Sequence, residues 1–376
     1  MRYNTHNFMS SFLIARQNLF SEKGRLLITA GGVAFSVIFI LLLLGLYQGW
    51  STQITKFLGA IDSDLWVGQK GSRDLSHSLS LLPIDLLEKV QNQPSVKAVS
   101  PFIGRQLTFE LKGQEAHLYL VGVDPGNLVR PYKIKEGKAR PSKNEIIIDN
   151  AFAQKERLKV NDTLIIQSKT LKIVGISEGG NLLVYTFALI DQADLIDLLQ
   201  FQQFTNYFLV KTNINVNEAQ NLLQKEFPEL SIVKKEQFLK NNAALLSETF
   251  LPIIGVLLLV AVLIGIAVIG LTIFTAAIEK SREYGVLKAL GFTDRQLFAI
   301  SLIQSIIAGF LGLLLGNILA PLLAFLAQTI TGGFLYEVGP REIILVAVLT
   351  LVMSIAASLL PLRRILSIDP AQVFKA

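Results

Sequence analysis

The chain has 376 residues, of which 51% are hydrophobic and 17% are charged, and its formal net charge is +6. The charged fraction is below the roughly 25% usual for soluble proteins, and the mean hydropathy of +0.48 also excludes an ordinary soluble protein. The absence of cysteine excludes disulfides, thiolate nucleophiles and cysteine-bound metal clusters. His6, His77 and His117 form no metal-binding spacing, so we expect no metal site.

The N-terminal part of the chain changes character at residue 26. Residues 1–25 are polar and amphipathic, and the spacing of Phe12, Leu13 and Arg16 suits a helix lying on the inner membrane face. Residues 26–47 carry no charge. They exceed the roughly 7–15 residues of a signal-peptide core and precede no cleavage motif. We therefore expect a retained transmembrane helix.

Three more apolar blocks follow near the C-terminal half, at residues 250–278, 298–330 and 343–360. Each approaches or exceeds the roughly 20 residues that a helix needs to cross the hydrocarbon core. The sequence therefore predicts an α-helical membrane protein with four transmembrane helices. A large extracytoplasmic α+β domain, residues 48–249, is inserted between helices 1 and 2, and residues 331–342 form a short outer loop.

The basic residues predict the orientation. The segments 1–25, 279–297 and 361–376 together hold 11 Lys and Arg against five Asp and Glu. Such an excess in short segments marks the cytoplasmic side, so both termini are expected there, as a cytoplasmic N-terminal segment and a cytoplasmic tail. The net charge then faces anionic lipid and a protein partner, and no nucleic acid is expected.

The outer domain reads as ordinary folded protein in which two β-α-β-like pieces flank a β-rich middle part. The sequence does not determine how its strands pair. Strands are predicted at residues 64–68, 96–103, 107–111, 116–123, 145–148, 163–167, 171–176, 207–211 and 230–233, helices at 83–93 and 217–227, and a hairpin turn at Lys112 and Gly113.

No catalytic constellation is visible in this domain. Asp62 and Asp64 are interpreted as solvated carboxylates near a strand start, and His117 as a packed or surface histidine. Gly179 and Gly180 lack a phosphate-loop context and are read as a turn. The domain is therefore expected to bind or to transmit movement.

Apolar residues at helical spacing flank the outer domain. Trp50, Ile54 and Phe57 lie on one side of it in sequence, and Leu245 and Phe250 on the other. We predict that these two segments pair as a stalk between membrane and outer domain. Two independent linkers are the alternative.

The apolar blocks contain no charged side chain, which argues against a proton- or ion-coupled transport path. Their mild polar residues, such as Thr272 and Ser354, are expected at helix–helix contacts. Gly309, Gly312 and Gly316 form a groove of small residues for close helix packing, either within the chain or in a dimer.

The loop between the second and third helices reads EKSREYGVLKALGFTDRQL, residues 279–297. Tyr284, Leu287 and Leu290 predict an apolar edge on a short amphipathic helix. Gly291 is a plausible C-terminal stop, and Thr293 suits the N-cap of the next helix. On these residues alone, the helix is an interfacial connector.

This loop resembles that of the MacB/FtsX/LolC-like permeases of ABC transporters, the type VII or mechanotransmission class. The family pattern E-[KR]-x-x-E-[IYF]-G-x-x-[KR]-A-[LI]-G is matched by Glu279, Lys280, Glu283, Tyr284, Gly285, Lys288, Ala289, Leu290 and Gly291. Two further stretches are also similar to the family. One is the ending, Pro361-Leu362-Arg363-Arg364 with Asp369-Pro370-Ala371, and the other is the start, Ala15-Arg16-Gln17-Asn18-Leu19.

The resemblance implies that the loop docks onto a cytoplasmic ABC ATPase subunit. The chain has no phosphate-loop motif, so no cofactor is expected in it, and ATP and Mg belong to the partner. The resemblance further implies a homodimer or heterodimer of permeases in the bacterial inner membrane, contact with lipid and an optional outer adaptor protein. The expected coupling residues are Glu279, Arg282, Glu283, Tyr284, Gly285, Lys288, Leu290 and Gly291.

Two functions follow from this resemblance. The first is a non-enzymatic permease subunit that couples ATP hydrolysis to motion of a periplasmic core domain, exporting or extracting a hydrophobic or peptide- or lipid-like cargo. The alternative is a non-transporting signalling subunit that regulates an outer hydrolase or a sensor kinase. A membrane-anchored enzyme is disfavoured because the catalytic constellation is missing.

Overall fold

The computed structural model describes residues 13–17, 19–75, 80–124, 126, 128–181, 185–331 and 334–362, with the backbone alone at residues 245–247, 249 and 331. The chain divides into two compact units. The membrane unit contains Met1–Leu46, Leu251–Leu326 and Tyr336–Ala376, and the outer unit contains Tyr47–Phe250 and Ala327–Leu335. Each unit has its own hydrophobic core.

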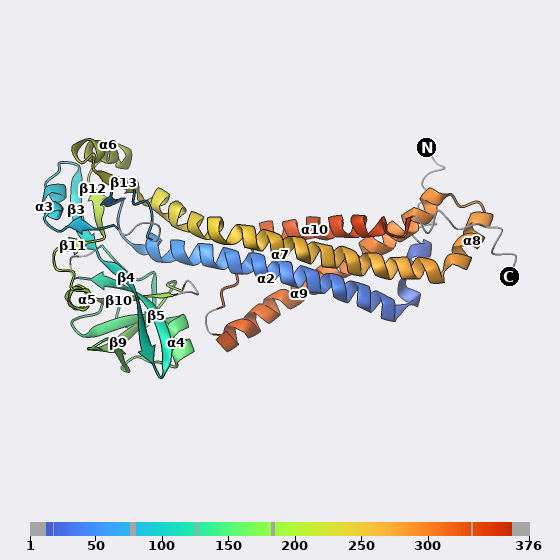
Figure 1. Cartoon of the computed structure of the whole chain (residues 1–376), viewed down its shortest axis with the longest axis horizontal. Coiled ribbons are helices and arrows are strands. Elements are labelled where there is room, and N and C mark those ends of the chain that lie inside the picture. Colours follow the sequence, from blue (N-terminus) through green and yellow to red (C-terminus); the bar gives the residue numbers. More distant parts are fainter. Residues whose placement is uncertain are drawn as a thin grey trace. The chain divides into compact units, whose positions relative to one another are not determined.

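Four helices among the described residues are long and apolar enough to cross a membrane. They are α2 (Lys23–Ala60), α7 (Lys235–Glu279), α9 (Asp294–Thr331) and α10 (Pro340–Ser358) (Figure 1). The four predicted membrane helices are therefore confirmed. α2 and α7, with 38 and 45 residues, extend beyond the apolar blocks, and their outer ends belong to the outer unit.

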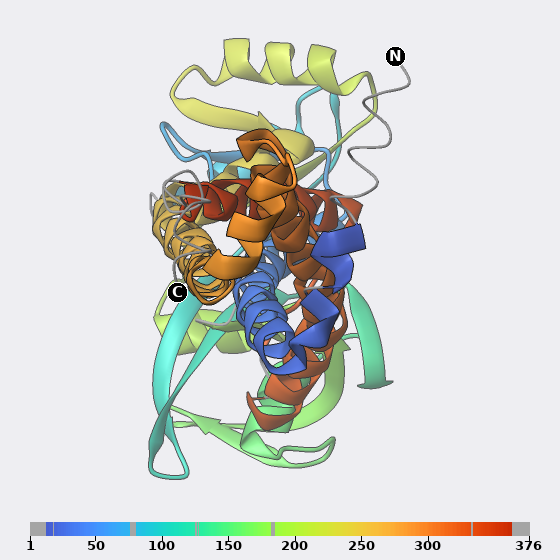
Figure 2. The ribbon, with the colours of Figure 1, turned by 90° about the vertical axis from the view of Figure 1, so that its right-hand side faces the viewer.

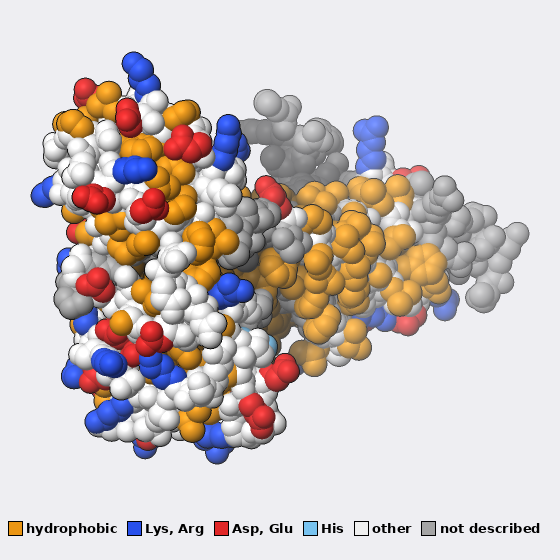
Figure 3. All heavy atoms as spheres, turned by 60° about the vertical axis from the view of Figure 1, so that its left-hand side comes forward, with side chains coloured by type: hydrophobic (Ala, Val, Ile, Leu, Met, Phe, Trp, Pro, Cys, Tyr) orange, Lys and Arg blue, Asp and Glu red, His pale blue; other side chains and the backbone are white. Residues whose placement is uncertain are grey.

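All four helices contribute to one core in the membrane unit. Val37 of α2, Ile269 of α7, Ala320 of α9 and Met353 of α10 are buried in the same cluster. The visible outer surface of this unit is dominated by hydrophobic side chains, whereas the outer unit has a mixture of charges (Figure 3). This distribution is what a bundle surrounded by lipid requires.

Several hydroxyl side chains of the bundle are hydrogen-bonded within their own helices. Thr272 Oγ1 donates to the Val268 carbonyl at 2.6 Å, and Ser354 Oγ donates to the Thr350 carbonyl at 2.9 Å. These two bonds run along one helix and not across two, because the carbonyl one turn back is within reach of a short hydroxyl side chain. Ser354 nevertheless lies at a helix contact, against Gly309.

The smaller sheet of the outer unit combines the two flanking pieces. Its strands are β1 (Leu65–Gln69), β3 (Val96–Phe102), β12 (Tyr207–Thr212) and β13 (Leu230–Lys234), in the antiparallel order β13-β1-β12-β3. With α3 (Leu86–Gln91) and α6 (Val216–Glu226), this is the β-α-β-β-α-β arrangement of ferredoxin-like folds, with a large insertion between β3 and β12.

The insertion forms a seven-stranded mixed sheet in the order β4-β5-β10-β7-β9-β6, with β8 pairing β9. Its interior is a continuous apolar core. The elements are β4 (Gly104–Leu111), β5 (Gln114–Val123), β6 (Lys133–Gly137), β7 (Glu145–Asp149), α4 (Asn150–Glu156), β8 (Thr163–Ile166), β9 (Lys169–Glu178), β10 (Thr186–Asp191) and α5 (Gln192–Leu199).

The predicted strands are present, with small shifts in their ends, and the turn between β4 and β5 has positive φ at both Lys112 and Gly113. The predicted helix at residues 83–93 begins only at Leu86, because Leu82–Pro83 forms the short strand β2 that pairs with β11 (Phe204–Thr205). The short elements α4, α5, β6 and β10 were not predicted.

Candidate functional site

The loop between α7 and α9 folds into α8 (Ser281–Ala289), a helix with a well-defined end. Gly291 has φ +93°, and its amide donates to the Lys288 carbonyl at 3.0 Å. The Phe292 amide donates to the Leu287 carbonyl, also at 3.0 Å. These two bonds form a Schellman motif, whose left-handed residue favours glycine. The expected stop at Gly291 is therefore present in the structure.

The start of α9 is defined just as sharply. Gln296 Oε1 accepts hydrogen bonds from the Thr293 amide at 2.7 Å and from Thr293 Oγ1 at 2.9 Å. Phe292 and Leu297, which flank the cap on either side, belong to one apolar cluster. A capped start with flanking apolar residues sets the angle at which the chain enters a helix. α8 is thus held at a defined angle to α9.

One face of α8 is buried in the membrane unit. Tyr284 is 3% exposed and packs with Ala15, Ala277, Leu297 and other residues of a cluster formed by the N-terminal segment, α7 and α9. Burial raises the pKa of the Tyr284 hydroxyl to about 12. Figure 2 shows this end of the unit, where the N-terminal helical turns and α8 lie. Tyr284 therefore anchors α8 to the bundle.

Ion pairs connect the end of α7 and the N-cap of α8 to the chain around the start of α2. Arg25 of α2 pairs with both Glu22 and Glu279, the last residue of α7, and Lys280 Nζ lies 2.9 Å from Glu22 Oε1. These residues alternate in sign, so each charge has an opposite neighbour. Arg25 and Glu22 were not among the predicted coupling residues, and Glu279 pairs across the bundle with Arg25, instead of along its own turn.

A further ion pair spans the turn after α8. Lys288 Nζ lies 2.8 Å from Asp294 Oδ1, and the Lys288 side chain is only 12% exposed. The two residues lie on opposite sides of the Schellman turn. The Lys288 side chain therefore lies on the buried side of α8, and its ion pair holds the helix to the start of α9.

The opposite face of α8 is exposed. It carries Arg282 and Glu283 together with Val286, which is 39% exposed, and Leu290, which is 74% exposed. Along the predicted apolar edge, Tyr284 is buried, Leu287 is half-buried and Leu290, the C-cap, is exposed. An exposed carboxylate beside two exposed aliphatic side chains is suited to docking a protein partner.

Gly285 is buried beside Tyr284 on the inner face of α8. It therefore belongs to the contact between α8 and the bundle, whereas Glu283, next in sequence to Tyr284, belongs to the exposed face.

The N-terminal segment predicted to be amphipathic is helical at residues 13–17 and 19–21, and Ala15 is fully buried. Residues 22–25 are also described, whereas residues 1–12 and 18, and the tail from residue 363 onward, lie outside the described residues.

Three of the predicted stalk residues, Trp50, Ile54 and Phe57, are buried within the outer unit, and Phe250 is half-buried. The rings of Trp50 and Phe250 lie 5.0 Å apart, so α2 and α7 touch at this level. Ile54 and Phe57 are each 4% exposed, and Phe57 stacks on Phe187 of β10 at 3.9 Å. α2 therefore contacts the seven-stranded sheet as well as α7. The side chain of Leu245 lies outside the described residues.

The predicted packing glycines of α9 face two other helices. A Cβ atom on Gly312 would lie 2.5 Å from Val33 Cβ and 2.9 Å from the Ala30 carbonyl oxygen, both in α2. Gly316 faces Val37 of α2, and Gly309 faces Ser354 of α10. These are contacts within one chain, and each leaves no room for a side chain.

The described residues contain no group of three or more His, Asp or Glu side chains arranged to hold a metal. His117 lies on β5 with its Nδ1 2.9 Å from Thr108 Oγ1, a cross-strand contact on the sheet. His6 and His77 lie outside the described residues. Asp64 departs from the expectation of a solvated carboxylate, since it accepts hydrogen bonds from Lys211 and Thr212.

Known families match both parts of the chain. Residues 26–226, more than half of the chain, match the MacB-like periplasmic core domain, and residues 255–370 match the FtsX-like permease C-terminal domain. The chain belongs to the MacB/FtsX-like family of ABC transporter permeases.

Individual relatives are distant but cover most of the chain. An uncharacterized ABC transporter permease of Mycobacterium tuberculosis H37Rv is 23% identical over 360 residues, covering 94% of this chain and 96% of that protein. The macrolide export ATP-binding/permease protein MacB of Sodalis glossinidius is 22% identical, covering 82% of this chain and 52% of MacB. Among solved structures, the periplasmic region of MacB from Actinobacillus actinomycetemcomitans is similar to this chain with a TM-score of 0.37 and 13% sequence identity. The match covers 49% of this chain and 94% of that structure.

Family membership makes this chain the permease subunit of an ABC transporter and implies an ATPase partner. The four apolar helices and the family point to a multi-pass protein of the inner membrane. A permease family also suggests a membrane subunit that is not itself an enzyme.

Proposed function

We propose that this chain couples ATP hydrolysis by a separate ATPase subunit to movement of its outer unit. The movement exports or extracts a hydrophobic, peptide-like or lipid-like cargo. The observation that carries the proposal is the two-sided character of α8, which exposes Glu283, Val286 and Leu290 while Tyr284 is buried in the bundle. In this account α8 is the coupling helix, and ATP and Mg are bound by the partner.

The anchoring of α8 supports this role. A force on the exposed face reaches α7, α9 and the N-terminal segment through the Tyr284 cluster, and α2 through the ion pairs of Arg25 and Lys280. A loosely attached connector would rotate under the same force. A helix buried on one face and capped at its end moves together with the bundle.

The stalk residues are the proposed route outward. α2 and α7 are continuous helices that begin or end in the outer unit, and the Trp50–Phe250 contact joins them. Gly312 and Gly316 hold α9 close to α2 on the membrane side of the same route. Relative movement of these helices is therefore the signal that we expect the outer unit to receive.

The basic segments place both termini and α8 in the cytoplasm in this proposal, where an ATPase is accessible. A homodimer or heterodimer of permeases, with an outer adaptor where one exists, completes the proposed assembly. The MacB relative is named for macrolide export, and this name supports export of an apolar cargo. No charged residue lies within the predicted apolar cores, which agrees with a cargo handled outside the membrane.

Affinity purification of the full chain in mild detergent tests the partner. We expect a small ABC ATPase to co-purify in stoichiometric amount. Co-purification of an outer adaptor would favour export, and a stable hydrolase or sensor kinase with no cargo release would favour the signalling alternative. Recovery of the intact chain without any ATPase would count against the proposed coupling.

A charge reversal on the exposed face of α8 tests the docking surface. Glu283→Lys is expected to reduce the co-purified ATPase roughly ten-fold or more, because losing a charged contact within an interface typically costs about 2 kcal/mol or more. The side chain is exposed, so the variant should fold normally.

The matched control is Glu226→Lys, the same charge change at an exposed position of α6 in the outer unit. It should leave ATPase recovery unchanged. If Glu283→Lys recovers as much ATPase as this control, the docking surface lies elsewhere.

A further inference from the structure

Both stalk helices join the outer unit at one end of the four-stranded sheet. α2 ends at Ala60, and residues 61–64 lead into β1, whereas β13 runs directly into α7 with no linker. β1 and β13 are adjacent antiparallel strands in which Leu65 lies opposite Lys234. The end of one helix and the start of the other are therefore attached side by side to neighbouring strands.

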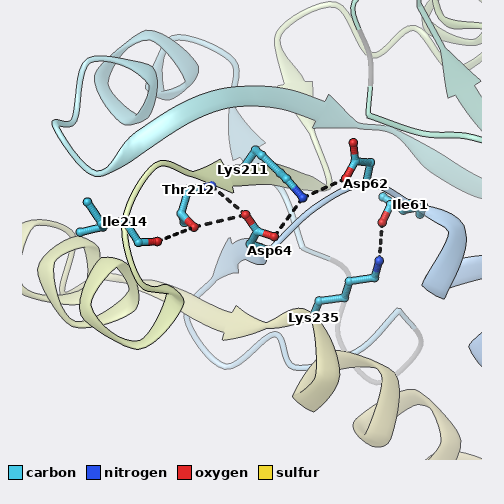
Figure 4. Close-up of polar contacts among 7 residues, drawn as sticks. All are labelled: Ile61, Asp62, Asp64, Lys211, Thr212, Ile214 and Lys235. Carbon is cyan, nitrogen blue, oxygen red and sulfur yellow. Dashed lines mark hydrogen bonds and ion pairs between the residues drawn. The ribbon is translucent and has the colours of Figure 1, made fainter.

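A lysine from a third strand bridges the linker. Lys211 Nζ of β12 lies 2.9 Å from Asp62 Oδ1 and 3.1 Å from Asp64 Oδ1 (Figure 4). The other oxygen of Asp64 accepts hydrogen bonds from the Thr212 amide at 2.9 Å and from Thr212 Oγ1 at 3.2 Å. The linker after α2 is thus tied to β12 by side chains as well as by the sheet.

Lys235 ties the two helix ends to each other. Its ammonium donates to the Ile61 carbonyl at 2.7 Å (Figure 4). Its backbone amide donates to the Asp64 carbonyl at 3.0 Å. The first residue of α7 therefore holds both ends of the linker that follows α2. The Asp62 amide in turn donates to the Leu128 carbonyl at 3.0 Å, which attaches the linker to the insertion.

Asp62 and Lys211 stay ionised near neutral pH. The hydrogen bond from Lys211 holds the pKa of Asp62 below its ordinary value, with Arg130 and Lys235 adding to the effect. The hydrogen bond to Asp62 likewise raises the pKa of Lys211. Lys211 therefore attracts two carboxylates from one linker, and a charge-assisted hydrogen bond is stronger than a neutral one.

Apolar packing next to the cluster is tight. Phe238, in the first turn of α7, stacks on Trp66 of β1 with ring centroids 4.1 Å apart, and both are almost fully buried. Ile61 is also fully buried. This core resists separation of the helices from the sheet, and the ion pairs add to the backbone hydrogen bonds that hold the more exposed residues of the linker.

We propose that Asp62, Asp64, Lys211 and Lys235 form a stiff joint that makes the four-stranded sheet follow the stalk helices. This inference rests on the proposed function, because it assigns the point where stalk movement enters the outer unit. The four residues are positioning residues. They touch no cargo, and they determine the angle between the helices and the sheet.

The stiffness of the joint is measurable in the permease alone, without ATPase or nucleotide. The chain has no cysteine, so spin labels can be attached at Lys97→Cys on β3 and Lys240→Cys on α7, both exposed positions. Double electron–electron resonance on the full chain in detergent then reports the distance between sheet and stalk. We expect one narrow distance distribution.

Lys211→Met keeps an unbranched side chain of similar length and removes its charge. It is expected to broaden the distance distribution, and Lys211→Arg should restore the narrow one. The matched control is Lys169→Met, because Lys169 bridges Asp194 and Asp197 within the outer unit in the same way but away from the joint. It should leave the distribution narrow. An unchanged width in Lys211→Met, with the chain folded, would overturn the proposal.

A second measurement, in the complex with its ATPase, tests the stiffness of the joint independently of the proposed function. Here the labels report the distance in the ATP-bound and ADP-bound states. A narrow distance distribution that is the same in both states supports a joint in which the sheet and the stalk helices move as one body. A width that changes between the states overturns it. Failure of any ATPase to bind would contradict the proposed function and leave the result in the permease alone intact.

Discussion

Asp149 is a buried carboxylate whose two oxygens each accept a backbone hydrogen bond. Oδ1 accepts from the Ala151 amide at 2.8 Å and caps α4, and Oδ2 accepts from the Gly180 amide at 2.8 Å. The side chain is 2% exposed. Burial raises its pKa to about 6, against the opposing effect of the two amides, and the charge of Glu178 raises it further.

The stability of the protein should therefore depend on the protonation of Asp149. Between pH 4 and pH 6 the folded chain keeps this proton and the unfolded chain loses it, so stability falls as the pH rises through this range. Relative to pH 4 and below, the free energy of unfolding is lowered most above pH 6, by about 3 kcal/mol at most. Thermal unfolding of the detergent-solubilised chain between pH 4 and pH 7 measures it.

Asp149→Asn isolates this contribution from the other carboxylates. The variant cannot titrate at residue 149, so the unfolding temperature of the wild type should fall relative to the variant as the pH rises from 4 to 6. Parallel curves for the two proteins would mean that Asp149 is ionised in the folded state throughout.

Single residues were predictable where their partners are close in sequence. Gly291 and Thr293 could be recognised as helix stop and cap, because both motifs involve only the adjacent turn. Asp64 was interpreted as solvated because Lys211, which pairs with it, lies 147 positions away. The Arg25–Glu279 pair was missed for the same reason, since 254 positions separate the two residues.

At the scale of elements, the length of a helix or strand determined whether it could be recognised in the sequence. The four apolar helices are visible in the sequence because each contains an uncharged run long enough to span the membrane. α4 and α5 have seven and eight residues, too few for a helical period to be visible, although Asp149 and Asp191 before them are typical N-caps. β10 is apolar and buried on both faces, so it shows no alternation.

The contact between α9 and α2 can be tested by adding a single methyl group. Gly312→Ala would place a Cβ atom 2.5 Å from Val33 Cβ and 2.9 Å from a backbone oxygen that cannot move aside easily. Overpacking of this kind typically costs about 1–3 kcal/mol. We expect a lower unfolding temperature in detergent.

The matched control is Gly255→Ala on α7, where a Cβ atom meets nothing within 4 Å. This variant should be as stable as the wild type or slightly more stable, because alanine favours the helix. If Gly312→Ala is as stable as Gly255→Ala, the contact between α9 and α2 has room for a methyl group and the proposed close packing is wrong.

At the scale of the whole molecule, the order of apolar and polar segments was enough to predict the architecture but not the sheets. The two β-α-β-like pieces could be recognised separately, yet their union in one sheet places Trp66 beside Leu209, far away in the chain. Strand pairing depends on contacts between distant segments, and one sequence does not reveal which segments meet.

The central claim is that nucleotide on the ATPase moves the outer unit relative to the membrane unit. In the cysteine-free chain, labels at Arg341→Cys in the membrane unit and Glu226→Cys in the outer unit report this movement within one polypeptide. Double electron–electron resonance on the complex, in ATP-bound and ADP-bound states, measures it. We predict a shift of the distance distribution that disappears with Glu283→Lys. Identical distributions in both nucleotide states, with the ATPase bound and active, would contradict the account.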